Sequence, residues 1–179
     1  MKNKITLVLV FLLIFVLSCA EKHEAVKKFE DVVKTLQTGD VERASREKEL
    51  KIEPETVEVY SEAYKKMTYK INRSSVQDNE VIINVTMKTP DFNGLVGEYV
   101  EKLSPLSVQM EGKSPEEKKA EEVKLMKELV KARLSSPDLK YLERTFDVTY
   151  KKSGDDWIID QSSSKDYIEM ITFGMLKVN

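Results

Sequence analysis

The chain contains a single cysteine, Cys19, at the point where an apolar run ends and a highly charged sequence begins. One thiol cannot form an intramolecular disulfide, so the rest of the chain must be stabilised by its hydrophobic core alone. About 160 residues follow Cys19, enough for one domain with a sizeable core. The fold therefore has to be specified by the pattern of apolar and polar residues.

The first 18 residues have the parts of an export signal. Lys2 and Lys4 precede residues 5–17, which are apolar except for Thr6, and a small residue, serine, follows. This core is shorter than the ~20 apolar residues needed to cross a ~30 Å hydrocarbon layer. We therefore expect residues 1–18 to be a cleaved signal peptide rather than a transmembrane helix.

Residues 16–19, Val-Leu-Ser-Cys, resemble the lipobox of bacterial lipoproteins, at which the cysteine is acylated and becomes the new N-terminus. Each buried methylene adds ~0.8 kcal/mol of membrane affinity, so several acyl chains give a lasting anchor. Cleavage beside Cys19 without acylation is the alternative. The lipobox implies a diacylglyceryl cysteine, palmitate-type acyl groups, a tether at 19–24 and one domain at 25–179, held on the outer side of a bacterial cell membrane.

The charge of the mature chain excludes some partners. Loss of Lys2 and Lys4 with the signal would take the formal net charge from −2 to −4. Nucleic-acid binding needs a basic surface with interleaved aromatics, so we expect no nucleic-acid partner. Electrostatic adhesion to an anionic membrane is disfavoured for the same reason.

Apolar residues recur at intervals of three and four in five segments, which predicts five helices. They are a helix closed by Gly39, one beginning at Pro54, one from Phe92, one from Ser114 to about Leu134, and one from about Ser164 to Leu176. Between the first two, residues 45–53 are charge-rich and are expected to be a solvated connection.

Four segments alternate with the period of a strand. In the second, Val81, Ile83, Val85 and Met87 share one apolar face. The others are residues 68–74, a strand with Leu142, Phe146, Val148 and Tyr150 on one face, and residues 157–159 after a hairpin at 153–156. Short turns join them in pairs, which predicts an α+β fold with an antiparallel sheet of about four strands covered by helices.

Three stretches together resemble small bacterial lipoproteins of the cystatin-like, nuclear transport factor 2-like superfamily. They are residues 29–44, with the Gly39-Asp40 turn, residues 85–92, with Thr-Pro-Asp at a helix start, and residues 151–160, where Trp157 follows a glycine turn. The resemblance implies a curved antiparallel sheet wrapped around helices as a cone with a pocket. The long helix near 115–134 departs from the usual pattern, which leaves the pocket's shape open. Many proteins of this group have no assigned activity, so the resemblance implies fold and location more than function.

The residues that could line such a pocket are Trp157, Tyr69, Tyr99 and Arg144. The alternative for Trp157 is a core anchor, and for Arg144, which interrupts an apolar strand face, an edge position near a turn. His23, the only histidine, is expected to lie in a flexible tether without further ligands, so we expect no metal site, cofactor or catalytic histidine. Asp155, Asp156 and Asp160 are interpreted as turn and capping residues rather than paired acids.

We therefore expect a surface-exposed lipoprotein that acts as a binding or interaction module, without catalysis. Its partner would be a small apolar ligand or another envelope protein. One alternative is an enzyme of isomerase or hydrolase type with a polar pocket, marked by a buried carboxylate of perturbed pKa. The other is a passive structural or antigenic surface protein, marked by an exposed apolar patch.

Overall fold

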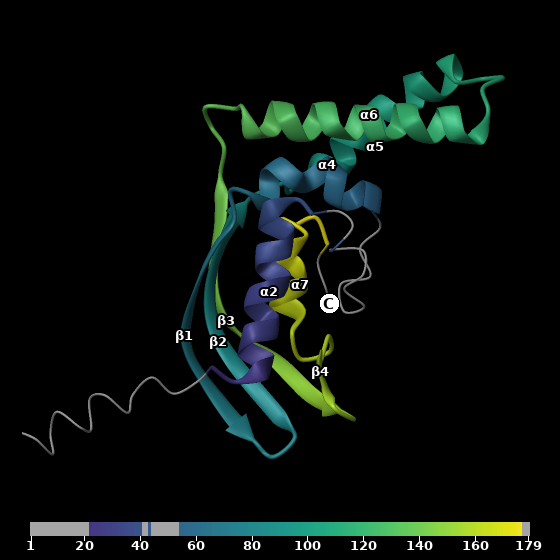
Figure 1. Ribbon diagram of the computed structural model, residues 1–179. Coiled ribbons are helices and arrows are strands. Elements are labelled where there is room, and N and C mark those ends of the chain that lie inside the picture. The colour runs from purple at the N-terminus through teal and green to yellow at the C-terminus, as the bar shows by residue number, and fades with distance from the viewer. Residues whose placement is uncertain (1–21, 41–42, 44–53, 177–179) are drawn as a thin grey trace, which may run out of the picture.

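The computed structural model describes residues 22–40, 43 and 54–176 of the chain (Figure 1). The predicted signal peptide, Cys19 and the predicted connection at 45–53 lie outside these residues. The elements are α2 (Glu24–Thr38), α4 (Pro54–Tyr64), β1 (Thr68–Gln77), β2 (Glu80–Pro90), α5 (Leu95–Gln109), α6 (Pro115–Leu134), β3 (Tyr141–Ser153), β4 (Asp156–Ile159) and α7 (Lys165–Ile171).

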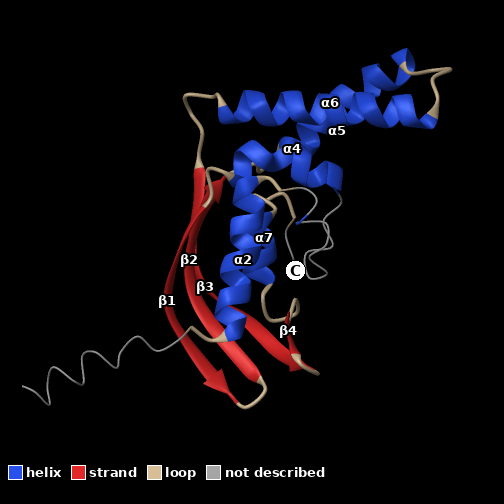
Figure 2. Ribbon diagram, viewed as in Figure 1, coloured by secondary structure: helices blue, strands red, loops and turns tan. Residues whose placement is uncertain are grey.

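The four strands form one open antiparallel sheet in chain order, β1-β2-β3-β4, which confirms the predicted α+β class (Figure 2). Val81, Ile83, Val85 and Met87 of β2 are all fully buried, as their alternation predicted. The sheet is curved, and its concave side faces α2 and α7.

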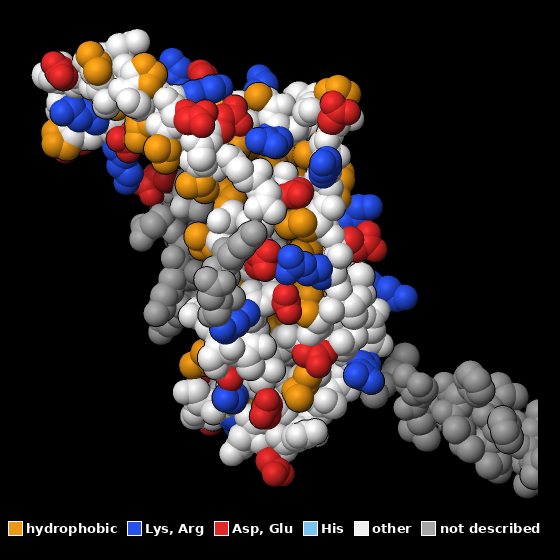
Figure 3. All heavy atoms as spheres, turned by 180° about the vertical axis from the view of Figure 1, so that it is seen from behind, with side chains coloured by type: hydrophobic (Ala, Val, Ile, Leu, Met, Phe, Trp, Pro, Cys, Tyr) orange, Lys and Arg blue, Asp and Glu red, His pale blue; other side chains and the backbone are white. Residues whose placement is uncertain are grey.

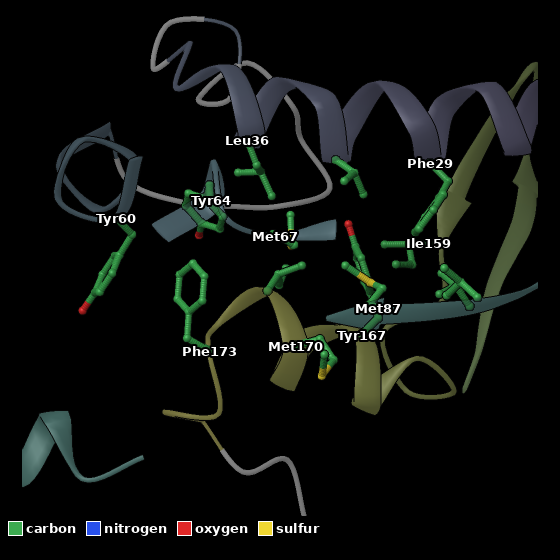
Figure 4. Packing of buried hydrophobic residues seen from close by; sticks show 14 of the residues in the cluster. Phe29, Leu36, Tyr60, Tyr64, Met67, Met87, Ile159, Tyr167, Met170 and Phe173 are labelled. Carbon is green, nitrogen blue, oxygen red and sulfur yellow. The ribbon is translucent and has the colours of Figure 1, made fainter. Parts of the chain in front are cut away.

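The core fills the space between this concave face and the helices (Figure 4). Phe29 of α2 packs against Tyr167 of α7 at 5.8 Å between ring centroids, and Met87 of β2 belongs to the same cluster. A second group of rings surrounds Phe173, which is 4.9 Å from Tyr64. The interior of the curve is thus occupied by side chains of the chain itself.

Helix ends follow the sequence signals closely. α2 is closed by Gly39, whose φ of 68° is left-handed. Glycine adopts this conformation with little steric strain because it has no Cβ atom. α6 begins with a capping box, in which Ser114 and Glu117 each bond the backbone N–H of the other.

Two expectations about helices need correction. The last helix was predicted to reach Leu176, but α7 ends at Ile171. Phe173 adopts a left-handed φ of 57° that turns its fully buried ring into the group around Tyr64 and Phe92, and this backbone cannot continue a helix. Leu176 is exposed as a result.

The second correction concerns α5. The helix was expected to begin at Phe92, but α5 begins at Leu95, after Gly94 in a left-handed conformation (φ 84°), and its Val96 and Val100 are 48% and 59% exposed. The reason for this exposure is visible in Figure 1, where α5 and α6 pair with each other and extend beyond the rest of the domain. In the described part of the chain, none of the helices is both long enough and apolar enough to cross a membrane.

Candidate functional site

The candidate site is a groove between α4 and α6 with a volume of about 480 Å³. The two helices run in the same direction, because Lys119 pairs with Glu55 and, farther along both helices, Lys127 pairs with Glu58. The groove is lined by Glu58, Val59, Ser61, Glu62, Lys66, Lys127, Val130, Lys131, Leu134 and Ser135. It lies at the end of the domain where α2 finishes, since Gly39 is packed against Ser61.

Three aliphatic side chains form the floor of the groove: Val59, Val130 and Leu134. Val130 continues the apolar stripe of α6, and it is buried because α6 rests on α4. Val59 is also buried, and it belongs to the same hydrophobic cluster as Val130.

Charged side chains form the rim. Glu58 is paired with Lys127 across the groove, and Glu62 is paired with Lys65 on its own helix. Lys66 and Lys131 also line the groove, and neither has a partner among the residues that the structure describes. Both lie near helix C-termini, where a cation is favoured by the helix dipole. The rim therefore offers two unpaired ammonium groups beside an apolar floor.

Two smaller hollows have polar linings. One of about 380 Å³ includes Arg133, which is bound to Glu98, and Asp91, which accepts from the backbone N–H of Asn93. The other, of about 280 Å³, lies on the outer face of the sheet beside Asn84 and Asp147, which bond each other. Ile82 is the single apolar residue among those lining the two hollows, whereas Val59, Val130 and Leu134 line the α4–α6 groove, so the groove is the better candidate for an apolar partner.

The four residues predicted to line a pocket do not come together around one. Tyr69 and Arg144 are both level with Met87 in the sheet register, one on each side of it, but the fully buried Met87 occupies the space between them. Tyr69 packs its ring edge-on against Phe29 at 5.6 Å, and burial raises its pKa. Tyr99 lies on α5, away from the sheet, and burial also raises its pKa.

Arg144 faces α7 from β3. Its guanidinium donates to both oxygens of Glu169, at 2.9 and 3.0 Å, and to Asp166 at 3.2 Å. The hydrogen bonds to Glu169 raise the pKa of Arg144 above its ordinary value. Its charge therefore joins the sheet to the last helix.

Trp157 is a core anchor, 6% exposed, at the end of the domain where α2 begins. His23 was expected in a flexible tether, but it is the N-cap of α2, where Nδ1 accepts from the N–H of Ala25. Its ring also lies edge-on against Trp157 at 4.8 Å. A cap and an aromatic partner thus hold this histidine, and Lys22 before it pairs with Glu30 of α2.

Asp156 and Asp160, near the last hairpin, each accept a local hydrogen bond, as predicted, and each also pairs with a lysine. Asp156 accepts from Lys28 and from the N–H of Trp157. Asp160 accepts from Ser162 and pairs with Lys151 at 2.7 Å, and its pKa is held far below the usual carboxyl range chiefly by this lysine. Within the described ranges, no group of three or more His, Cys, Asp or Glu residues could hold a metal ion.

Sequence reasoning missed the groove, because its walls come from two helices about 60 residues apart. Val59 lies four residues before the buried Ala63, so its spacing does not separate it from the core stripe of α4.

Comparison with known proteins gives one structural similarity. No protein-family model matches the chain, and no curated protein matches it. The fold is similar to the crystal structure of YcdA, a provisionally assigned lipoprotein of Bacillus subtilis, with 19% sequence identity and a TM-score of 0.41. The match covers 83% of this chain and 47% of YcdA, so the chain spans about half the length of that protein.

Proposed function

We propose that the protein is an exported lipoprotein, anchored by acylated Cys19, that acts as a non-catalytic interaction module. Its α4–α6 groove binds an apolar segment with acidic residues from another protein of the cell envelope. The observation that carries this proposal is the combination of an aliphatic floor with Lys66 and Lys131, two rim cations that no described side chain neutralises.

A protein segment fits the groove better than a small apolar ligand. The concave face of the sheet, where an enclosed ligand would lie, is filled by residues such as Phe29, Met87 and Tyr167. The α4–α6 groove is open along one side, so a small ligand would leave part of its apolar surface in water. An amphipathic helix laid between two helices covers such a floor and keeps its own polar face solvated.

The rim favours acidic partners. A carboxylate beside Lys66 or Lys131 gains a charge-assisted hydrogen bond without displacing an existing ion pair. On the face drawn in Figure 3, acidic and basic side chains are interspersed, so that face presents no large field of one sign to compete for the partner. Specificity would therefore come from the groove rather than from the overall charge.

Catalysis has no part in the proposal. The only histidine caps a helix, and Arg144 is bound to two carboxylates, so both are committed to the fold. We also propose that the domain is a variant of the cystatin-like, nuclear transport factor 2-like arrangement. The support for this is a curved antiparallel sheet around α2, with α5 and α6 inserted between β2 and β3.

A pull-down with a matched charge control tests the binding role. The chain from residue 20 onward is immobilised as wild type, as Lys66→Glu/Lys131→Glu, and as Lys34→Glu/Lys124→Glu, whose lysines are exposed and outside the groove. Quantitative mass spectrometry then identifies the envelope proteins retained from detergent extracts. We expect a defined protein to be retained by wild type and control but about tenfold less by the groove variant, a loss equal to about 1.4 kcal/mol. The same proteins retained equally by all three would refute the proposal.

A further inference from the structure

The tether between the anchor and the folded domain is short. Contacts with the folded domain are already present at Lys22, which pairs with Glu30, and at His23, which caps α2 and packs on Trp157. Only four residue steps separate His23 from Cys19, and a fully extended chain of that length spans at most about 14 Å. An acylated Cys19 would therefore keep the His23 end of the domain close to the lipid surface.

Both β-hairpin ends lie at this same end of the domain. Trp157, the partner of His23, belongs to the β3–β4 hairpin. The β1–β2 turn is beside that hairpin, because the N–H of Lys152 donates to the carbonyl of Asn79 at 2.8 Å. Figure 2 shows the strands of both hairpins ending together where α2 starts.

The α4–α6 groove lies at the opposite end. α2 leads from His23 to Gly39, and its 15 residues span about 22 Å at 1.5 Å per residue. Gly39 is packed against Ser61, a residue of the groove lining. The groove is thus separated from the anchored end by the length of this helix.

We propose that the two hairpin ends form the membrane-facing surface of the protein and rest against the lipid headgroups. This inference rests on the proposed anchor at Cys19. It adds that the domain stands on the bilayer end-on, with the groove held away from the membrane, where another protein can reach it.

The surface chemistry of the hairpin ends suits a headgroup layer. Two ion pairs lie there, Lys28 with Asp156 and Lys151 with Asp160, and Asp78, Glu80 and Asp155 make the hairpin ends mildly acidic, which suits uncharged or zwitterionic headgroups. Each hairpin carries one exposed aliphatic residue, Val76 or Ile158. These side chains can approach the headgroups without the desolvation cost that a polar or charged group would incur. The outer face of the sheet is less suited to lipid, because Asn72, Asn84 and Thr86 form a polar ladder there.

The chain has one cysteine and one tryptophan, which makes a direct test simple. The chain from Cys19 onward is coupled through that thiol to a maleimide headgroup lipid in phosphatidylcholine vesicles. A second lipid carries a nitroxide on its headgroup, and nitroxides quench tryptophan fluorescence only at short range. We expect Trp157 to lose fluorescence in these vesicles relative to vesicles without nitroxide.

Two controls make the test decisive. Insertion of about twenty Gly and Ser residues after Ala20 leaves the domain unchanged and adds a tether of roughly 25 Å, so quenching should be lost. In Trp157→Phe/Val108→Trp the probe moves to α5, and it should remain unquenched. Absence of quenching with the natural tether, or equal quenching at position 108, would overturn the end-on arrangement. In this experiment a maleimide bond replaces the acyl groups, so its result does not depend on whether Cys19 is acylated in cells. Acylation itself is tested separately, by the mass of the N-terminal residue of protein isolated from cells.

Discussion

Arg144 offers the sharpest test of how the fold uses its charged residues. Its guanidinium makes three hydrogen bonds to α7, two to Glu169 and one to Asp166. We predict that Arg144→Met, which keeps most of the aliphatic stem, lowers the free energy of unfolding because Glu169 is left without its partner. The side chain of Glu169 is only 16% exposed, so water compensates poorly for the loss.

The expected size follows from the geometry. Hydrogen bonds to charged groups contribute about 1.5–3 kcal/mol when buried, whereas exposed ion pairs contribute about 0–1 kcal/mol. The side chain of Arg144 is 39% exposed, which places the pair between these limits. We expect a loss of about 1–2 kcal/mol, equivalent to a fall in Tm of roughly 2–8 °C for a domain of this size.

Urea denaturation of the wild type, Arg144→Met, Glu169→Gln and the double variant measures the effect as a double-mutant cycle. We predict a coupling energy of about 1 kcal/mol between the two residues. Lys88→Met is the control, because Lys88 pairs with Glu143 at 3.7 Å on exposed side chains and should change stability by less than about 0.5 kcal/mol. A coupling energy near zero, with Arg144→Met no worse than Lys88→Met, would refute the structural role and leave Arg144 free for a ligand.

Three further predictions test other parts of the account. Lys151 holds the pKa of Asp160 low, so this carboxylate adds stability above its unfolded pKa of ~3.9 that is lost as the pH falls below that value. Asp160→Asn should therefore flatten the acid part of a plot of Tm against pH, and an unchanged slope would contradict the assignment. Ser114→Ala removes the capping box of α6 and should lower the free energy of unfolding by about 1 kcal/mol. Amide hydrogen exchange in the first turn of α6 should become faster, and unaltered exchange there would contradict the role of Ser114 as a cap. Intact mass spectrometry of membrane-bound protein should find acylated Cys19 at the N-terminus, whereas an unmodified cysteine in that fraction would contradict the anchor.

Much of the fold could be predicted from local pattern. The alternation from Val81 to Met87 identified a buried sheet face, and the structure confirms it in full. Ser114 and Gly39 marked helix ends because capping depends on residues adjacent in sequence. Turns between paired strands limited the sheet to an antiparallel order.

The errors arose where distant residues decide the outcome. α7 stops early because Phe173 turns into a ring cluster with Tyr64, about 110 residues earlier, and no local signal in the sequence reports that contact. Arg144 interrupts an apolar strand face, but only the fold shows that Glu169 lies opposite it. The groove likewise depends on α4 and α6 meeting, which the spacing within either helix does not report.

The central claim is that the α4–α6 groove binds another envelope protein, and photocrosslinking in membranes tests it most directly. A photoreactive residue replaces either Ser135, exposed on the groove lining, or Lys70, exposed on β1 away from it, in the full chain. We predict one defined protein adduct from position 135, absent from position 70, that disappears when Lys66→Glu/Lys131→Glu is added. Adducts of equal yield at both positions, or an adduct unaffected by the charge reversal, would contradict the account.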